Sequence, residues 1–521
     1  MPLVIIRPFA GRRLAGRFRS RSYNAMKYVS ALLFALSTAS LVVGEDKPNI
    51  LIILSDDQGY CDLGSTLDIA TADNLGAPLA AKYRAIQACT DNEAPIAVCF
   101  EAARKCSPNL DALARQGVRF TQFYSAPTCS PARAALMTGR YPQSFGVYTN
   151  TDVVVDDKGV PPAVKFPVKV FQNAGYMTGI VGKWHLGSRQ AGQHPNDRGF
   201  DYYFGFDIAV TQKYNSKRLY RNRETTQAVG WLADQTSAEA VAFLDRSQQE
   251  QRPFFLYVAY NEPHGPTERP PQPYIDHFKS GSDVVDVHFG TIYGMDHGIG
   301  RILDELKRTG RMANTLIVFC SDHGDQLFEH GITDKNCFFE ASVRVPFMVS
   351  LPGRIQPARY DQLIETVDLL PTLFEFIGLP EPRECQGRSF APLIANLGRA
   401  YEPHDAVFSE NIIPEVITGG KLNMPFEKGK GVGGTRHPDA KMVRTERWKY
   451  CYYPDGYAEL YDVPNDPQER TNLAGRAEFH TVEDDLRTRL LNWLINSSET
   501  DQIAPRWLIP ENEKVQRREL Q

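Results

Sequence analysis

The chain has 521 residues, and its 58 Lys and Arg oppose 62 Asp and Glu, which gives a formal net charge of −4. This balance excludes a nucleic-acid-binding protein that relies on a basic surface, and the length suffices to bury a large core. The 42% hydrophobic content excludes a disordered chain. The chain contains nine cysteines, and because this number is odd, at least one of them cannot form a disulfide within the chain.

Residues 1–44 are predicted to be a targeting segment. Residues 1–25 are rich in Arg and contain no Asp or Glu, and an apolar stretch at 28–43 follows Met26, which is a possible true start. The stretch is shorter than the roughly 20 residues of a membrane-spanning helix, so it is typical of a secretory signal, with a buried N-terminal helix as the alternative. After its removal we expect a secreted or periplasmic protein without stable membrane insertion.

Residues 45–399 are predicted to form one α/β domain. Apolar runs typical of buried strands alternate with helical patterns, with strands at 49–54, 176–181, 254–259, 315–320 and 345–351 and helices at 108–117, 233–245 and 300–309. This alternation favours a largely parallel sheet covered by helices.

From about residue 400 the pattern changes, and residues 400–521 are predicted to form a smaller α+β subdomain. Aromatic runs at 448–453 and 457–461 flank Pro454-Asp455-Gly456, which is typical of a β-hairpin. A polar helix is predicted at 481–496. The simplest fold for this part is a small antiparallel sheet with one helix.

Polar side chains follow four of the predicted strands, at the ends where open α/β sheets place their ligand sites. These side chains are Asp56, Asp57, Lys183, His185, His264, Asp322 and His323. An isolated Asp-Asp pair is most often a solvated turn, but two carboxylates in a cleft repel each other unless a cation neutralises them. The oxygen donors favour Ca²⁺ or Mg²⁺, whereas an imidazole ligand also suits Zn²⁺ or Mn²⁺. Lysines such as Lys183 and Lys335 would then suit an anionic substrate.

Cys129 opens a further predicted helix. Pro131 suits the first helical turn, and Thr128 or Ser130 could cap it. A thiol at the positive end of a helix has a lowered pKa and can act as a nucleophile, whereas in an exported protein a disulfide is the alternative. Arg133, one turn further along, favours the nucleophile because it adds a cation.

These residues together resemble the sulfatase family. The Cys-x-Pro-x-Arg core is present from Cys129 to Arg133, and residues 136–140 (LMTGR) resemble the element behind it. The stretch GYMTGIVGKWHLG at 175–187 is similar to the second family signature, and further matches lie at 47–51, 321–331 and 459–473. The resemblance implies an alkaline-phosphatase-like fold, with a large mixed, mostly parallel sheet flanked by helices and a small C-terminal antiparallel sheet.

The resemblance also implies the chemistry of Cys129. In the family a formylglycine-generating maturation enzyme oxidises this cysteine to formylglycine (3-oxoalanine), an aldehyde that hydrates to a diol. One diol oxygen would attack sulfur and expel the alcohol, and deprotonation of the second hydroxyl would eliminate sulfate. A serine or a thiol lacks this second hydroxyl and cannot release sulfate in this way.

Roles for the other residues follow from the same resemblance. The implied metal ligands are the Cys129-derived oxygen together with Asp56, Asp57, Asp322 and His323. Ca²⁺ is expected ahead of Mg²⁺ or Mn²⁺, although members often carry Asn at the place of His323. Arg133 would hold the diol, and Lys183 and Lys335 would neutralise sulfate oxygens. His185 would accept the diol proton, and His264 or Lys335 would protonate the leaving alcohol.

Residues 61–106 depart from the family pattern. This insert contains Cys61, Cys89, Cys99 and Cys106, which we expect to form two disulfides. If Cys129 becomes formylglycine, 9 − 1 = 8 cysteines remain, an even number.

The sequence thus predicts an exported sulfuric ester hydrolase, of the arylsulfatase kind, that acts on a sulfated sugar or polysaccharide. A phosphonate or phosphodiester hydrolase of the same superfamily is the alternative, and a non-catalytic carbohydrate-binding relative is the third hypothesis. The group that carries the sulfate is expected to meet loops at 190–198, 215–224 and 419–437. Candidate contacts there are Arg218, Arg221, Arg223, Arg436 and His437.

Overall fold

The computed structural model of the chain describes residues 47–67, 96–151, 159–188, 190–208, 212–265, 268–327, 330, 335–395, 397–412, 439–454 and 456–498. The predicted targeting segment, Cys89, the side chain of Cys99 and the whole of the predicted loop at 419–437 lie outside the described residues.

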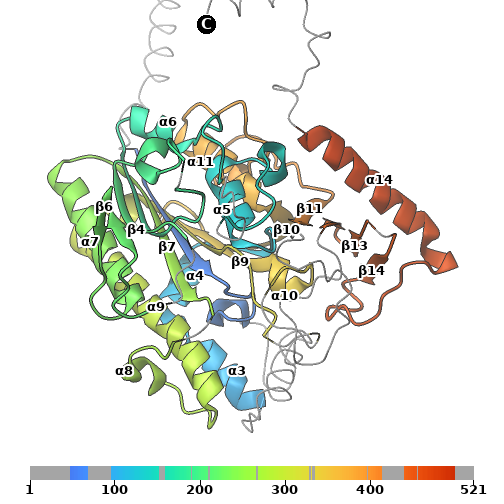
Figure 1. The fold of residues 1–521 in the computed structure, drawn as a ribbon, viewed down its shortest axis with the longest axis horizontal. Helices are drawn as coiled ribbons and strands as arrows, with labels where there is room; N and C mark the ends of the chain where they lie inside the picture. The colour runs from blue at the N-terminus through green and yellow to red at the C-terminus, as the bar shows by residue number, and fades with distance from the viewer. Residues whose placement is uncertain are drawn as a thin grey trace, which may run out of the picture. The chain divides into compact units, whose positions relative to one another are not determined.

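A ten-stranded mixed sheet forms the centre of the structure (Figure 1). In spatial order its strands are β10 (Ala358–Glu365), β2 (Val118–Tyr124), β9 (Arg344–Ser350), β8 (Thr315–Ser321), β1 (Asn49–Asp56), β7 (Phe254–Pro263), β3 (Met177–Lys183), β4 (Tyr202–Phe206), β5 (Leu219–Arg221) and β6 (Glu224–Thr226). The five strands from β8 to β4 are mutually parallel, and β9, β5 and β6 pair antiparallel with their neighbours. The predicted mixed, mostly parallel sheet is therefore confirmed.

Helices cover both faces of this sheet. One face carries α3 (Ile96–Lys105), α4 (Pro108–Gln116), α7 (Leu232–Gln249) and α9 (Asp283–Arg308), and the other carries α5 (Cys129–Thr138), α6 (Val168–Asn173) and α11 (Leu369–Ile377). Successive residues of β1 pack alternately into the hydrophobic cores on the two faces of the sheet. Leu51 and Ile53 lie in one core, and Ile50 and Ile52 lie in the other. Because a central parallel strand is buried on both faces, it is apolar throughout, and this is why the sequence revealed β1 clearly.

The remaining helical segments are short. They are α8 (Gln272–Ile275), α10 (Glu340–Val343) and α12 (Ala391–Ile394), with 3₁₀ turns η1 (Gly64–Leu67), η2 (Pro142–Phe145), η3 (Pro195–Arg198), η4 (Met312–Asn314), η6 (Thr366–Asp368) and η7 (Ala477–Phe479).

Helix α9 is longer than the sequence predicted. It begins at Asp283, whereas the prediction began at residue 300. The glycines at 290, 294 and 298 conceal the helical pattern, but they allow α9 to approach α7 and the residue before it closely. A Cβ atom at Gly298 would lie 2.1 Å from the Ser237 hydroxyl, and one at Gly294 would lie 2.6 Å from the Trp231 ring. Close packing against neighbouring side chains, which is not visible in the sequence, explains why this part of the helix was missed.

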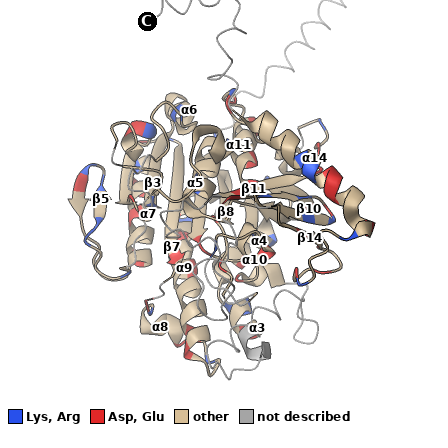
Figure 2. Ribbon diagram, turned by 45° about the vertical axis from the view of Figure 1, so that its right-hand side comes forward, with Lys and Arg blue, Asp and Glu red and all other residues tan. Residues whose placement is uncertain are grey.

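A second, four-stranded antiparallel sheet lies in the C-terminal part. Its order is β11 (Val407–Ile412), β12 (Asp439–Arg444), β13 (Trp448–Tyr452) and β14 (Ala458–Asp462), and α14 (His480–Ser497) packs on it. The predicted hairpin and the final helix are both present. Charged side chains line α14, whereas the central strands of the large sheet carry few (Figure 2).

The two sheets share a packed interface. Tyr124 and Leu363 of the large sheet contact Val407 and Met442 of the small one in a continuous apolar cluster. Beside this cluster, the Lys449 ammonium lies 2.7 Å from Glu340 and 2.6 Å from Glu469. Apolar packing and buried ion pairs thus fix the C-terminal sheet against the sheet that carries the site.

The structure contradicts the prediction of two disulfides in the insert. Cys106 is buried and forms no disulfide, and its Sγ lies 3.0 Å from the Ala103 carbonyl oxygen. With Cys106 unbridged, the four cysteines cannot supply two pairs. The thiol instead packs in the hydrophobic core, where burial raises its pKa well above the usual value. Within the described ranges, no helix has the length and apolar character of a membrane span.

Candidate active site

Two neighbouring strands deliver the acidic part of the site. β1 ends at Asp56, and β8 runs parallel to it with Ser55 opposite Ser321, so Asp56 and Asp322 emerge side by side. Asp57 follows with a φ of 70°, in the left-handed region, and one of its carboxylate oxygens lies within 4.8 Å of one of Asp56. These three carboxylates are almost fully buried, so they need cations nearby.

Hydrogen bonds hold Asp322 and His323 against β1. One carboxylate oxygen of Asp322 accepts from the Asp57 amide at 3.2 Å and from the His323 amide at 2.9 Å. The His323 ring lies between two other groups, with Nδ1 3.1 Å from Asp57 Oδ1 and Nε2 3.2 Å from the Cys129 sulfur. His323 thus connects the acidic cluster to the predicted nucleophile.

Cys129 is the first residue of α5. Its Sγ is buried 3.8 Å from Asp56 Oδ1. Burial opposes ionisation of the thiol, but the Lys183 and Lys335 cations, His323 and a hydrogen bond with His185 lower its pKa well below the usual value. The direction is the one expected for a thiol at the start of a helix, but here it is neighbouring cations that lower the pKa. Thr128 occupies the N-cap position, but its side chain makes no capping hydrogen bond.

Arg133 lies one helical turn beyond Cys129, and its guanidinium is fully buried. It lies 2.9 Å from Asp322 and 3.3 Å from Asp56, and it donates to the Lys183 carbonyl oxygen at 3.3 Å. Arg133 therefore fixes α5 relative to the ends of β1, β8 and β3. The spacing of one turn places this cation beside the nucleophile without obstructing its sulfur.

Two lysines form ion pairs with the adjacent aspartates. Lys183, at the end of β3, contacts Asp56 Oδ2 at 2.7 Å, and Lys335 contacts Asp57 Oδ1 at 2.6 Å. Lys183 is the largest influence that holds the pKa of Asp56 well below its usual value against the opposing effect of burial. Each aspartate thus has its own ammonium group.

The histidines complete the predicted set. His185 is fully buried, and its carbonyl oxygen accepts a 2.7 Å hydrogen bond from the Ser130 hydroxyl, next to Cys129. The His264 Nε2 lies 3.7 Å from Asp57 Oδ2, and its side chain is 17% exposed. His264 therefore lies at the more open side of the cluster. All ten predicted site residues converge, although they come from segments more than 250 residues apart.

The cluster fits a metal ion. Ligand atoms of Asp56, Cys129, Asp322 and His323 lie within 4.8 Å of one another, and so do those of Asp56, Asp57, Cys129 and His264. Burial raises the pKa of Asp322 to about 6, because the nearby Asp56 charge adds to the cost of ionising it. A divalent cation would remove this cost, and a donor set dominated by carboxylate oxygens suits a hard cation.

One residue near this cluster was not predicted. Lys213, on the segment after β4, is 2% exposed, and its ammonium donates to the Asn261 carbonyl oxygen at 2.6 Å. Burial lowers its pKa, while Glu262, Asp56 and Asp57 favour its charged form. No local motif marks an isolated lysine, so the sequence contained no signal for it. Lys213 anchors this segment to the end of β7.

Two of the arginines expected to contact substrate also form ion pairs within the chain. Arg221 pairs with Glu239, and Arg223 pairs with Asp197 at 2.6 Å. Arg436 and His437 lie outside the described residues.

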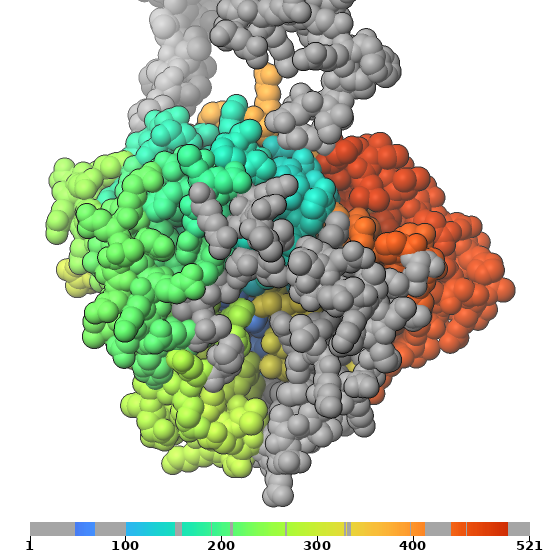
Figure 3. All heavy atoms as spheres, in the orientation of Figure 1, coloured from blue at the N-terminus to red at the C-terminus, as the bar shows by residue number. Residues whose placement is uncertain are grey.

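In the space-filling view, part of the blue segment that contains β1 is visible near the centre of the face, between green and yellow atoms (Figure 3).

Comparisons with known proteins identify the family. A family model described as Sulfatase matches residues 48–379. The uncharacterized sulfatase YdeN of Escherichia coli is 36% identical over 393 residues, covering 69% of this chain and 68% of its own. The ulvan-active sulfatase of Formosa agariphila is 28% identical over 411 residues, covering 74% and 75%.

A solved structure supports the same fold. The crystal structure of Ps i-CgsB in complex with k-i-k-neocarrahexaose has a TM-score of 0.66 and 24% identity, and the match covers 91% of this chain and 97% of that one. Together with the family match, this likeness identifies the alkaline-phosphatase-like fold.

The chain belongs to the sulfatase family. It is a sulfuric ester hydrolase, and the family's use of a metal agrees with the buried cluster around Asp56.

Proposed function

We propose that this chain is an exported, formylglycine-dependent sulfatase that removes sulfate from a sulfated saccharide. The observation that supports the proposal most strongly is the position of Cys129. Its sulfur lies at the start of α5 within reach of Asp56 and His323, and two lysine cations lower its pKa. A nucleophile beside carboxylates and cations suits the transfer of an anionic group.

The metal would be held by Asp56, Asp57, Asp322 and His323 together with the side chain at position 129. When bound, it supplies Lewis-acid polarisation of an oxygen on the substrate. Ca²⁺ is the proposed ion because three of these protein ligands are carboxylates. Arg133 pairs with both Asp56 and Asp322 and so helps to position these two ligands before an ion binds.

Formylglycine at position 129 supplies a nucleophile that can release sulfate by elimination. The remaining chemistry falls to side chains already in place. Lys183 and Lys335 flank position 129 and stabilise negative charge on the sulfate oxygens as the sulfur–oxygen bond breaks. His185 takes up the proton from position 129, since it is one of the groups that lower the pKa of the Cys129 thiol.

Departure of the alcohol requires a proton from the open side of the site. His264 is the most exposed member of the cluster, and its Nε2 is held near Asp57. It is therefore placed to protonate the leaving oxygen, and Lys335 is the second group in reach of the same aspartate. The relative named for ulvan supports a saccharide as the substrate class.

Turnover by enzyme produced with a maturation system tests the proposal. We expect release of sulfate from 4-nitrophenyl sulfate and from members of a panel of sulfated saccharides, and intact-mass analysis should show formylglycine at position 129. Cys129→Ala should abolish the release, whereas Cys385→Ala, a matched cysteine variant outside the site, should not. Faster hydrolysis of bis(4-nitrophenyl) phosphate than of the sulfate would favour a phosphodiesterase and contradict the proposal.

Export is a separate part of the proposal, supported by the sequence of residues 1–44. Expression of the full chain in a bacterial host, followed by fractionation, should recover the processed protein outside the cytoplasm. Recovery of unprocessed chain in the cytoplasm would contradict it.

A further inference from the structure

Lys213 is a buried cation beside the acidic cluster, and the reaction proposed above does not use it. The residue is 2% exposed, and burial lowers its pKa, whereas the charges of Glu262, Asp56 and Asp57 oppose that effect. Lysine is almost never fully buried unless it is paired, because its charge must be taken out of water. The contacts of Lys213 therefore indicate what the residue does.

Lys213 holds the chain on both sides of His264. Its ammonium donates to the carbonyl oxygen of Asn261, three residues before His264, at 2.6 Å. Its backbone amide donates to the carboxylate of Glu268, four residues after His264, at 2.8 Å. One residue thus restrains both flanks of the position from which the His264 side chain extends.

Lys213 is itself fixed to the large domain. Its carbonyl oxygen accepts a 2.8 Å hydrogen bond from the amide of Leu232, the first residue of α7. The hydroxyl of the adjacent Tyr214 donates to the Arg269 carbonyl oxygen at 3.0 Å. The segment of Lys213 and Tyr214 is thus a brace between the start of α7 and the part of the chain that carries His264.

His264 needs such a brace because the sheet does not hold it. β7 ends at Pro263, so His264 is the first residue beyond the strand. Its Nε2 lies 3.7 Å from Asp57 Oδ2, which is longer than an ordinary hydrogen bond, and its Nδ1 contacts the carbonyl oxygen of the adjacent Gly265. The position of the ring therefore depends on the backbone on either side of it.

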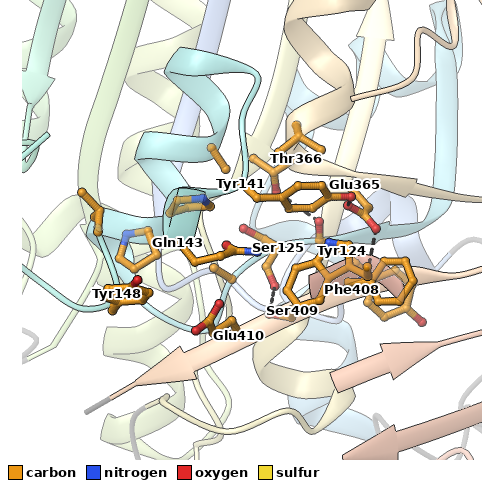
Figure 4. A pocket seen from close by; sticks show the side chains of 17 residues that line it. Tyr124, Ser125, Tyr141, Gln143, Tyr148, Glu365, Thr366, Phe408, Ser409 and Glu410 are labelled. Carbon is orange, nitrogen blue, oxygen red and sulfur yellow. Dashed lines mark hydrogen bonds between the residues drawn. The ribbon is translucent and has the colours of Figure 1, made fainter. Parts of the chain in front are cut away.

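The pocket between β2, α5, β11 and α14 does not take part in this arrangement. Side chains such as Tyr141, Tyr148 and Glu410 line it, and neither His264 nor Lys213 is among the lining residues (Figure 4). The brace is built instead from direct hydrogen bonds within the chain.

We propose that Lys213 is a positioning residue that holds His264 where it can protonate the leaving alcohol. The proposal rests on the proposed function, since it assigns Lys213 to the leaving-group step of that reaction. In this step the ester's sulfur–oxygen bond breaks, its electron pair stays on the leaving oxygen, and the proton of His264 moves to that oxygen. Lys213 contributes by fixing the Asn261 and Glu268 flanks, and it does not touch the substrate.

Two substrates with different leaving groups test this role. The 4-nitrophenolate ion is a weak base and leaves without a proton, whereas the alkoxide of a saccharide is a strong base and needs one. Lys213→Met removes the ammonium but keeps the backbone amide that bonds Glu268. Its kcat on the best sulfated saccharide of the panel should fall by about 10²-fold, the cost of a misplaced catalytic group. Its kcat on 4-nitrophenyl sulfate, and KM for both substrates, should stay within about threefold of wild type, because binding and sulfur attack are unaffected.

Two further lysine variants are the controls. Lys213→Arg keeps a charged donor and should recover part of the lost rate on the saccharide. Lys279→Met removes an exposed lysine and should leave both substrates unaffected.

Variants of His264 and Glu268 show whether Lys213 acts through His264. His264→Ala should give the same dependence on the leaving group. Lys213→Met combined with His264→Ala should be no slower than His264→Ala alone, because the brace then has no acid to position. Glu268→Ala removes the acceptor on the other flank and leaves the buried ammonium in place, so it should give the same pattern with a smaller loss.

Crystal structures of the variants give a readout that does not depend on turnover. In Lys213→Met the segment from Asn261 to His264 should be displaced, so that the His264 ring no longer lies beside Asp57. Lys213→Arg and Lys279→Met should keep the ring in its wild-type position.

The outcomes separate this proposal from the proposed function. Equal losses on the two substrates, additive losses in the double variant, or an unmoved His264 in Lys213→Met overturns the role of Lys213 and leaves the sulfatase activity standing. A wild-type protein that releases no sulfate from any substrate overturns the proposed function instead, and the crystal structures then still decide whether Lys213 positions His264.

Discussion

Lys449 is the buried cation that joins the C-terminal sheet to the large domain, and Lys449→Met tests how strongly it does so. The ammonium lies 2.7 Å from Glu340 and 2.6 Å from Glu469, and it also donates to the Phe338 carbonyl oxygen at 2.7 Å. Its side chain is 0% exposed, against 10% and 2% for the two glutamates. Methionine keeps most of the volume but removes the charge.

The expected loss follows from these distances. At an effective dielectric constant of about 20, an ion pair at 2.7 Å is worth about 6 kcal/mol before the cost of desolvation is subtracted. Glu340 keeps Arg344 and Arg444, each 3.8 Å away, whereas Glu469 keeps the Glu340 amide at 2.7 Å. The variant therefore leaves mainly one buried carboxylate, that of Glu469, without an ion-pair partner. Its free energy of unfolding should fall by about 3–5 kcal/mol.

The loss of stability in Lys449→Met should depend on pH, because the Glu469 carboxyl titrates. Burial raises the pKa of Glu469 to about 7 even beside Lys449, and loss of the ammonium raises it further. A carboxyl whose pKa is raised by folding contributes stability that is present at low pH and is lost as pH rises through the folded-state pKa. The deficit of Lys449→Met against wild type should thus be largest near pH 8 and shrink towards pH 5.

Urea unfolding of both proteins across this pH range measures the deficit. Lys307→Met is the matched control, because Lys307 pairs with Asp304 on the surface at 60% exposure, and it should change stability by less than about 0.5 kcal/mol. Lys449→Met combined with Glu469→Gln should recover much of the loss at pH 8. A deficit below about 1 kcal/mol, or one that does not vary with pH, would refute the reasoning.

Three further predictions concern the site and its strand. Gly182→Ala should prevent native folding, seen as loss of soluble protein, because its Cβ would lie 1.8 Å from the Ala259 carbonyl oxygen; Gly310→Ala, with no atom within 4 Å, should fold with a loss of about 1–2 kcal/mol. Lys183→Met should lower kcat/KM for 4-nitrophenyl sulfate by about 10²–10³, and a decrease below tenfold would argue against its role in charge stabilisation. Ca²⁺ at about 100 times its Kd should stabilise the protein by about 2.7 kcal/mol over the chelated form in thermal unfolding, and an undiminished shift in Asp57→Asn would contradict the proposed ligand set.

The sequence was sufficient for the parts of the molecule that have a local pattern. Buried parallel strands must be apolar along their whole length, and the change to polar residues at Asp56, Lys183 and Asp322 marks where they end. Since parallel strands end at the same edge of a sheet, these residues had to meet once the strands paired. Cys129 and Arg133 were identifiable because four residues in a helix form about one turn.

Other features were decided only by tertiary contacts. The glycines of α9 look like breaks in a helix, yet Gly298 is needed because Ser237 lies against it. Cys106 was expected in a disulfide, but its thiol packs in a core that the sequence could not locate.

Lys213 illustrates the same limit near the functional site. It is buried close to the acidic cluster, yet no local motif marks it in the sequence. Local patterns record how a segment folds with its immediate neighbours, whereas a binding surface depends on which distant segments meet. The sequence by itself determined the strands, the helix of the nucleophile and the charged groups of the reaction. Tertiary packing decided which other side chains lie near these elements, because only packing fixes the distances between segments that are far apart in the sequence.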